Sequence, residues 1–343
     1  MKLGLIAGYW PSSGPPPDAA DQIAAAEELG FDSIWTSEAY GSDCFTPLAW
    51  WGSQTERVKL GTAITQISAR TPASTAMTAI TLDHLSGGRV ILGLGVSGPQ
   101  VVEGWYGQDY AKPLARTREY IDIVRRIVAR DEPVSYAGEH YAMPLQGGTG
   151  LGKPLKSIVR PLRTDIPIYL GAEGPKNVAL AAEIGDGWLP MFFSPKADDF
   201  YRAALAEGFA RPGARHTAED FEVACVVPVV PGDDVEACAD LLRPNLALYI
   251  GGMGARDRNF HKDVFERLGY GAECEKIQDA YLDGRKADAA AAVPTAMVED
   301  VYLVGPPDKI RDDLVRWRET CVTSLLVAGP RALLEQITEI VNG

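Results

Sequence analysis

Three glycines, Gly93, Gly95 and Gly98, form the spacing G-x-G-x-x-G in the segment GLGVSG, directly after the strand-like run RVIL. In a dinucleotide-binding fold this spacing opens a helix that holds the pyrophosphate, and an acidic residue about 20 positions later binds the ribose. Here Gly98 is followed by PQVVEGWYGQDYAKP, which is broken by glycine and proline, and Glu119 lies inside a helical pattern. We therefore interpret these glycines as the end of a strand in another fold, where they either pack tightly or let a flat ligand approach the backbone.

A fourth glycine, Gly174, precedes Pro175 and Lys176 in the segment LGAEGPKNV. Proline is favoured at the first position of a helix, and the free N–H groups and dipole of a helix start attract anions. Lys176 adds a positive charge. The segment indicates either a phosphate site or an ordinary helix start.

One acidic residue, Glu38, ends the mostly apolar run DSIWTSE. A buried carboxylate without a partner costs free energy, so we predict that Glu38 is paired unless it is a solvated surface group. The four histidines show no metal-ligand spacing, and the patterns H-E-x-x-H, G-x-S-x-G and the P-loop are absent. We expect no metal, and motifs assign no catalytic residue.

Composition narrows the class of protein. The 343 residues carry a formal net charge of −13, which argues against nucleic acid or an anionic membrane as a partner. The five cysteines form no C-x-x-C pair, and no apolar run reaches the roughly 20 residues of a membrane helix. The start MKLGLIAGYW is interpreted as a first strand rather than a signal sequence, so we expect a cytoplasmic protein that acts on a small molecule.

Strand-like runs and helical patterns alternate along the chain. We predict eight strands at 2–9, 32–38, 59–67, 89–96, 166–172, 187–193, 221–230 and 324–329. We predict helices at 18–30, 45–56, 72–86, 113–130, 175–185, 195–210, 234–250 and 331–341. The alternation and the apolar strands predict a (β/α)8 TIM barrel, with a doubly wound sheet plus an appended domain as the rival.

The barrel is expected to be a single domain over residues 1–343. Two segments, about 132–165 and 254–298, do not fit the alternation, and we expect them to be insertions over the C-terminal mouth, where active sites of such barrels lie. Four cations without a neighbouring acid lie in the first of these segments: Lys153, Lys156, Arg160 and Arg163. They form either a binding patch for an anionic ligand or an ordinary solvated loop.

Three segments, occurring in this order, carry a resemblance to a known family. They are EELGFDSIWTSEAY, KLGTAITQISARTPASTAMTAITLDHLSGGRVILGLGVSG and IPIYLGAEGPKNVALAAEIGDGWLP. In combination they resemble the luciferase-like monooxygenase family of TIM barrels, specifically the actinobacterial members of its branch that uses coenzyme F420, an 8-hydroxy-5-deazaflavin. The resemblance covers nearly the whole chain and implies an oxidoreductase that transfers a hydride between the deazaflavin and an organic substrate. It also implies a homodimer, and the four cations would then receive the polyglutamate tail of the cofactor.

The resemblance implies which residues bind the cofactor. Glu38 matches the acidic residue of the second strand that lines the site, and the step from Ala63 to Ile64 matches a non-prolyl cis peptide behind the ring. The turn after the fourth strand and the phosphate-binding backbone match Val96, Ser97, Gly98, Ala172, Glu173 and Gly174. Trp10, Met191 and Phe193, at other strand ends, are expected to enclose an apolar substrate.

Two departures from the relatives leave the proton donor or acceptor unassigned. Dehydrogenase relatives have a His after the second-strand acid and a Glu on the fourth-strand turn, where this chain has Ala39 and Gly98. The substrate and the direction of hydride transfer are left open. Two alternatives remain: an FMN-dependent monooxygenase of the same fold, and a deazaflavin-binding carrier or sensor without turnover.

Overall fold

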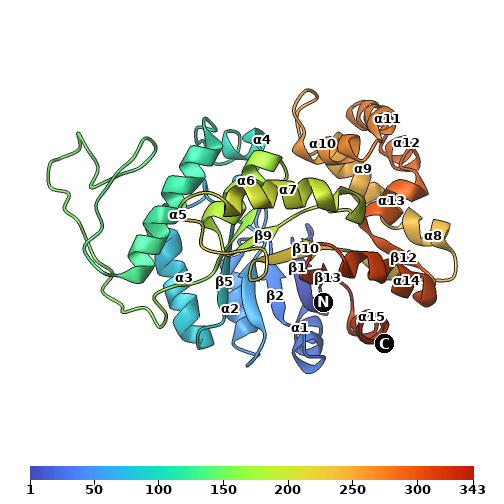
Figure 1. The fold of residues 1–343 in the computed structure, drawn as a ribbon, viewed down its shortest axis with the longest axis horizontal. Helices are drawn as coiled ribbons and strands as arrows, with labels where there is room; N and C mark the ends of the chain where they lie inside the picture. Colours follow the sequence, from blue (N-terminus) through green and yellow to red (C-terminus); the bar gives the residue numbers. More distant parts are fainter.

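The computed structural model describes all residues, 1–343, and forms a closed parallel barrel (Figure 1). Its sheet has nine strand segments in the order β3-β2-β1-β13-β10-β9-β8-β5-β4, and β3 also pairs with β5, which closes the ring. The segments β3 and β4 are parts of one strand interrupted at residues 63 and 64, so nine segments make eight barrel strands. The closed ring confirms the TIM barrel and excludes the doubly wound sheet.

Each predicted strand contains an observed one. The bounds are β1 Lys2–Gly8, β2 Ser33–Thr36, β3 Lys59–Thr62, β4 Thr65–Gln66, β5 Val90–Gly95, β8 Ile168–Gly171, β9 Gly187–Leu189, β10 Glu222–Val226 and β13 Ser324–Val327. All neighbouring barrel strands pair in parallel, so their carboxyl ends meet at one end of the barrel.

Eight helices surround the barrel. They are α1 Ala19–Glu28, α2 Phe45–Gly52, α3 Pro72–Ser86, α5 Pro113–Ala129, α6 Pro175–Ile184, α7 Asp198–Phe209, α14 Pro307–Arg318 and α15 Arg331–Asn342. A short turn of 3-10 helix, Pro195–Ala197, precedes α7. Helix α14 was not predicted, although its buried Ile310, Leu314 and Trp317 follow the spacing i, i+4, i+7. The helix predicted at 234–250 is instead two helices, α8 Val235–Asp240 and α9 Arg243–Gly251, which lie outside the barrel ring.

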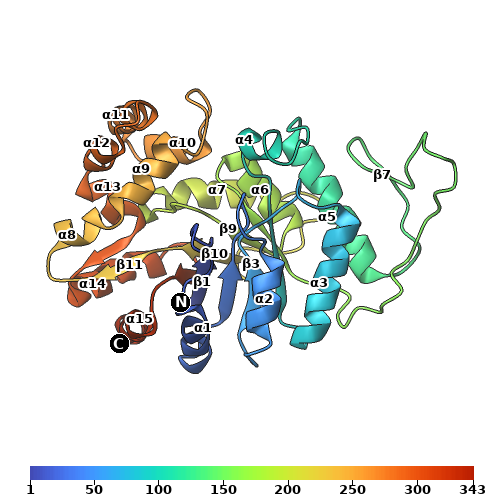
Figure 2. The ribbon, with the colours of Figure 1, turned by 180° about the vertical axis from the view of Figure 1, so that it is seen from behind.

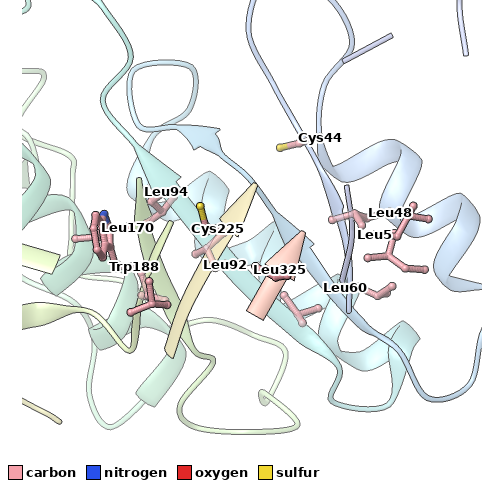
Figure 3. Close-up of a cluster of buried hydrophobic side chains, with 14 of the residues drawn as sticks. Leu5, Cys44, Leu48, Leu60, Leu92, Leu94, Leu170, Trp188, Cys225 and Leu325 are labelled. Carbon is pink, nitrogen blue, oxygen red and sulfur yellow. The ribbon is translucent and has the colours of Figure 1, made fainter. Parts of the chain in front are cut away.

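The core has two layers, one on each side of the strands. Leucines such as Leu60, Leu92 and Leu325 are buried between the barrel and its helices (Figure 3). Inside the barrel, the rings of Trp35 and Tyr169 lie with their centroids 5.7 Å apart. A Cβ atom at Gly61 would lie 2.2 Å from the Trp35 ring, so this glycine makes room for the large interior side chain.

The segment 132–165 does not lie over the mouth, contrary to expectation. It contains the short strands β6 Tyr136–Ala137 and β7 Ala142–Met143, and it projects from the side of the molecule (Figure 2). The Glu119 carboxylate of α5 accepts hydrogen bonds from the backbone N–H groups of Glu139, His140 and Tyr141, which holds the segment against the outside of α5. The physical reason is its position in the chain: it follows a helix, whereas the connections over the mouth follow strands.

The second inserted region is larger than expected and has a core of its own. It extends from β11 Val229–Pro231 to β12 Leu303–Gly305, which pair in parallel. Between them, α8 and α9 are followed by α10 Phe260–Arg267, α11 Gly271–Leu282, α12 Lys286–Ala291 and α13 Thr295–Val301. Phe192 of the barrel is part of the same buried cluster as these helices. We propose on this ground that the whole chain is one domain. No helix has both the length and the apolar character needed to cross a membrane.

Candidate active site

The carboxyl ends of the barrel strands bring the predicted site residues to one end of the molecule. Figure 2 shows α4, which spans Pro99–Val102, and α10 of the inserted region at this end, beyond the strands. The predicted residues follow four strands that are neighbours in the ring: β2, the β3–β4 strand, β5 and β8. The site can therefore be built strand by strand.

The carboxylate of Glu38 is buried and paired, as predicted. Its side chain is 6% exposed, and Nη1 of Arg70 donates to both of its oxygens, at 2.6 and 2.7 Å. The backbone N–H of Gln66 donates to the same carboxylate at 3.2 Å, and the Gln66 side chain donates to the Glu38 carbonyl at 3.1 Å. Burial lowers the pKa of Arg70, but hydrogen bonding to Glu38 and its negative charge raise it more, so this pKa lies above its usual value. Sequence reasoning predicted a partner for Glu38 but did not find Arg70.

The peptide bond between Ala63 and Ile64 is cis, as the resemblance implied. The backbone on either side is held by Ser37, whose hydroxyl donates to the Ala63 carbonyl at 2.9 Å, and by Gln66, which Glu38 binds. A Cβ atom at Gly95 would lie 2.3 Å from the Ile64 side chain. Glu38 therefore holds the interrupted strand through Gln66, and Gly95 leaves room for the Ile64 side chain.

The glycine spacing of residues 93–98 thus has two different uses. A Cβ atom at Gly93 would lie 1.7 Å from the Thr62 carbonyl oxygen, so Gly93, like Gly95, is required by packing between strands rather than by a ligand. Ser97 has a φ of 64°, in the left-handed region that side chains rarely adopt, and Gly98 begins α4. Val96, Ser97 and Gly98 are only partly buried, and they form the backbone surface at this strand end.

The turn after β8 has the features of an anion site. Gly174 precedes α6, no side chain caps this helix, and nothing lies within 4 Å of the position of a Cβ atom at Gly174. Ala172 is buried and its carbonyl accepts a hydrogen bond from the Trp188 indole at 2.8 Å, which fixes the turn. An uncapped helix start with open space beside it fits a phosphate.

Glu173 lies in the same turn with its side chain directed into the protein. One carboxyl oxygen accepts from the Met191 backbone N–H at 3.1 Å, and the other, Oε2, is buried without a partner. Burial raises the pKa of Glu173 to about 8, although the Met191 N–H and the charge of Arg267 act in the opposite direction. Arg267 of α10 also donates to the Glu173 carbonyl at 3.4 Å. Near neutral pH this carboxyl group is therefore largely protonated, so it does not repel an anion bound at the turn.

Aromatic side chains from several loops surround the mouth. Tyr40 and Trp105 have ring centroids 6.5 Å apart, and the Tyr106 hydroxyl donates to the Ala39 carbonyl at 3.0 Å. Tyr40 and Trp105 are 58% and 64% exposed, so their rings are free to contact a ligand. These aromatic residues were not predicted to be part of the site, although Tyr40 is only two positions beyond Glu38.

Phe193 does not line the mouth, contrary to expectation. It is fully buried behind the strands, where it packs against Trp188, Tyr201 and Trp317. Phe192, its neighbour, is buried in the core of the inserted region. Phe192 and Phe193 are neighbours in the chain, but one is buried in the core of the inserted region and the other in the core between the barrel and its helices. Which core each ring enters depends on tertiary packing, and the sequence pattern does not predict it.

The predicted cation patch is also not at the mouth. Arg163 forms an ion pair at 2.6 Å with Asp83 near the end of α3, and the Arg160 carbonyl accepts from His84 of the same helix end. Lys156 donates to the Asp131 carbonyl just beyond α5. The ends of α3 and α5 lie beside the amino ends of the strands that follow them, so Lys156, Arg160 and Arg163 lie at the end of the barrel opposite to the start of α6. Binding of a cofactor tail by the four cations stays a prediction, and the position of these three away from the mouth does not support it.

Two hollows in the surface lie away from the mouth. One is lined by apolar residues of α3 and α5 and by residues 164–168, and the other lies at the end of α5. Neither adjoins any of the strand ends described above.

The sequence profile of the family described as luciferase-like monooxygenase matches residues 5–324. The chain belongs to this family. One relative, from Mycobacterium tuberculosis, is named "Putative coenzyme F420-dependent oxidoreductase" and is 57% identical over 342 residues, which cover 99% of this chain and 98% of the relative. A 5,10-methylenetetrahydromethanopterin reductase of Archaeoglobus fulgidus is 28% identical, covering 90% of this chain and 88% of the relative.

Solved structures share the fold of this luciferase-like protein. The coenzyme F420-dependent tetrahydromethanopterin reductase from Methanopyrus kandleri superposes with a TM-score of 0.79 at 25% identity, covering 100% of this chain and 98% of the other. An F420-dependent secondary alcohol dehydrogenase, solved with an F420-acetone adduct, has the same TM-score at 18% identity, covering 100% of this chain and 98% of the other. An FMN-containing Baeyer-Villiger monooxygenase component from Pseudomonas putida has a TM-score of 0.68 at 20% identity, covering 99% and 98%. The last two likenesses concern the fold alone.

Proposed function

We propose that this protein is an oxidoreductase that transfers a hydride between coenzyme F420 and a small organic substrate. The observation that carries the proposal is the 57% identity, over 99% of the chain, to the relative named as dependent on coenzyme F420. The geometry supports it, because a supported strand interruption and an uncapped helix start lie at the same end of the barrel. When bound, the deazaflavin supplies the hydride chemistry, and the protein supplies position and electrostatics.

In this proposal two groups of residues would bind different parts of the cofactor, the ring at the ends of β3 and β5 and the phosphate at the end of β8. Ala63, Ile64 and the backbone of Val96, Ser97 and Gly98 would hold the deazaflavin ring. Ala172, Glu173 and Gly174 would hold the phosphate at the start of α6, where Lys176 adds a charge. Glu38 acts through Gln66 and Arg70 to keep the interrupted strand in place, because its carboxylate is already occupied by these two partners.

The test is a comparison of cofactors on the purified protein. Absorbance or fluorescence titration is expected to show tighter binding of oxidised F420 than of FMN, and the reduced complex is expected to reduce an organic acceptor without consuming stoichiometric oxygen. Tight binding of FMN with formation of peroxide or an oxygenated product would contradict the proposal and support the monooxygenase. Tight F420 binding with no acceptor in a broad screen would instead support a carrier or sensor.

We also propose that the protein is a homodimer. The arm formed by residues 132–165 exposes Leu145, Leu151, Leu155 and Ile158, which are 77%, 85%, 68% and 96% exposed. A projecting segment with this much apolar surface is typical of an interface, and a second copy is the commonest partner of a protein of this kind.

A further inference from the structure

The helix α10 crosses the end of the barrel between β8 and β9. Its last residue, Arg267, donates to the Glu173 carbonyl after β8, and His261 in its first turn packs against Phe192 after β9. Asn259 caps the helix by accepting from the backbone N–H of His261 at 3.0 Å. The Asn259 side chain also donates to the carbonyls of residues 249 and 250, each at 2.8 Å, which joins α10 to α9. The backbone of His261 is therefore held from both sides.

The ring of His261 belongs to a group of packed aromatic side chains and is itself partly buried. It packs edge-on against Phe192 and Tyr249, at centroid distances of 5.8 and 4.9 Å. Tyr249 in turn interacts with Tyr9, which directly follows β1. Tyr9 keeps 49% of its surface exposed, yet burial raises its pKa. Because Tyr9 lies at the carboxyl end of β1, this group of aromatic residues reaches the mouth.

Charged groups do not act on the His261 ring. The surrounding titratable groups on α9 and the barrel are the phenols of Tyr249 and Tyr9, and Tyr302 contacts Phe192 from the far side. Lys262 points to Gln278 and Glu266, at 3.1 and 3.3 Å. Asp263, the other charged neighbour in the first turn, does not pair with the imidazole. Burial alone lowers the pKa of His261 to about 4, so the ring is neutral at pH 7.

The position of the single ring proton follows from the hydrogen bonds. Nδ1 is buried and has no partner, and Nε2 makes no hydrogen bond within the protein. An orphaned buried N–H group is rarer than an orphaned acceptor, so the proton is expected on Nε2. The Nε2–H group of His261 is then a hydrogen-bond donor that has no acceptor within the protein.

Building on the proposed function, we infer that His261 is the residue of the inserted region that donates a hydrogen bond, through Nε2–H, to an acceptor group of the substrate at the mouth. The acceptor would be a neutral group such as a carbonyl, because a neutral imidazole attracts an anion only weakly. The aromatic rings of Tyr9 and Tyr40 would contact the apolar remainder of the substrate. This places a polar contact from the inserted region beside the ends of β8 and β9.

The first test needs neither cofactor nor turnover. The chain has four histidines, so ¹⁵N imidazole spectra are simple, and a His261→Gln variant assigns the relevant signals. We expect the Nε2–H tautomer for His261 and no titration near pH 6.5. His216 is the internal control: burial lowers its pKa, but the hydrogen bonds and charges of Asp186 and Asp220 raise it more, so it titrates above its usual value. A proton on Nδ1, or titration of His261 near pH 6.5, would overturn the inference.

The second test uses two probes of the same shape. Cyclohexanone offers an acceptor, and cyclohexylammonium offers only donors. Cyclohexanone should shift the His261 Nε2–H signal, whereas cyclohexylammonium should not. His261→Phe should weaken cyclohexanone binding roughly five-fold, the loss expected for one neutral hydrogen bond, and His261→Gln should retain most of it because its amide can donate. Equal binding by the Phe variant, or no response of His261 to the ketone, would overturn the inference.

The outcome separates the two proposals. If F420 fails to bind but the ketone still shifts His261, the proposed function fails and the donor role stands. If F420 binds tightly and His261 gives no response to the ketone in the loaded protein, the donor role fails and the proposed function stands.

Discussion

The Glu38 carboxylate and the Arg70 guanidinium form the most completely hydrogen-bonded ion pair of the site, with side chains 6% and 20% exposed. Removing one partner of a buried pair leaves a charge that water cannot reach, whereas removing both leaves a smaller defect. The pair joins the end of β2 to the segment that begins α3. Its energetic role can therefore be measured independently of any ligand.

We predict that Arg70→Met lowers the free energy of unfolding by about 3 kcal/mol, measured by urea denaturation. The double variant Arg70→Met with Glu38→Gln should recover part of this loss. Arg57→Met is the control, since Arg57 is 67% exposed in its pair with Glu27 and should change the stability by less than about 1 kcal/mol. A double variant less stable than Arg70→Met would contradict the prediction.

Glu173 makes stability depend on pH. Its folded pKa of about 8 lies above the ordinary 4.5, so between these values the folded protein keeps a proton that the unfolded chain releases. The stabilisation is complete at low pH and is lost as the pH rises through 8. Compared with Glu173→Gln, the wild-type protein should lose up to about 1.4 kcal/mol of unfolding free energy per pH unit between pH 5 and 8. Parallel pH profiles for the two proteins would show that this carboxyl group is ionised when folded.

At the scale of elements, the start of α6 differs from the glycine-rich end of β5. Gly93 and Gly95 are surrounded by Thr62 and Ile64, so their replacement would disturb the barrel. Gly174 has an ordinary φ of −84° and open space around it, so a side chain there can be accommodated without moving the backbone. This difference allows binding to be tested without loss of the fold.

We predict that Gly174→Val weakens F420 binding roughly ten-fold, which corresponds to about 1.4 kcal/mol, because the side chain would occupy the approach of the phosphate to the helix start. The melting temperature should not fall. Gly271→Val is the matched control, since Gly271 begins α11 and also has no atom within 4 Å of its Cβ position. Normal F420 affinity in the Gly174 variant would mean that α6 has only an ordinary start.

At the scale of the whole molecule, the arm of residues 132–165 exposes apolar side chains that do not pack against the barrel. We predict that light scattering finds twice the chain mass of 37.0 kDa. Substituting Leu155 and Ile158 with Asp should shift the protein toward the monomer, because exposed apolar contacts would be replaced by charges. His140→Ala, at another point of the arm, should leave the mass unchanged. A monomeric wild-type protein would refute the proposed dimer.

The sequence by itself determined the features that depend on neighbouring residues. Apolar runs that alternate with helical patterns predicted all eight strands, because parallel strands that are buried on both faces consist of continuous apolar segments. Proline after Gly174 predicted the start of α6, and the match of residues 59–67 to a known family implied the cis peptide at Ala63. The three buried apolar residues of α14 also follow a helical spacing, but most of the other residues of this helix are charged, so the pattern was not recognised.

Only the tertiary structure decided which distant residues meet. Glu38 needed a partner for a reason visible in the sequence, but Arg70 is 32 positions away and its selection depends on how β2 and α3 lie together. Arg163 could be recognised as a cation, but it binds Asp83, which lies at the end of the barrel opposite to the start of α6. The contact between His261 and Phe192 depends on how the inserted region packs against the segment that follows β9. The spacing of apolar residues along the chain predicts which residues are buried and which segments are helical. Contacts between segments far apart in the chain depend instead on the packing of the whole barrel.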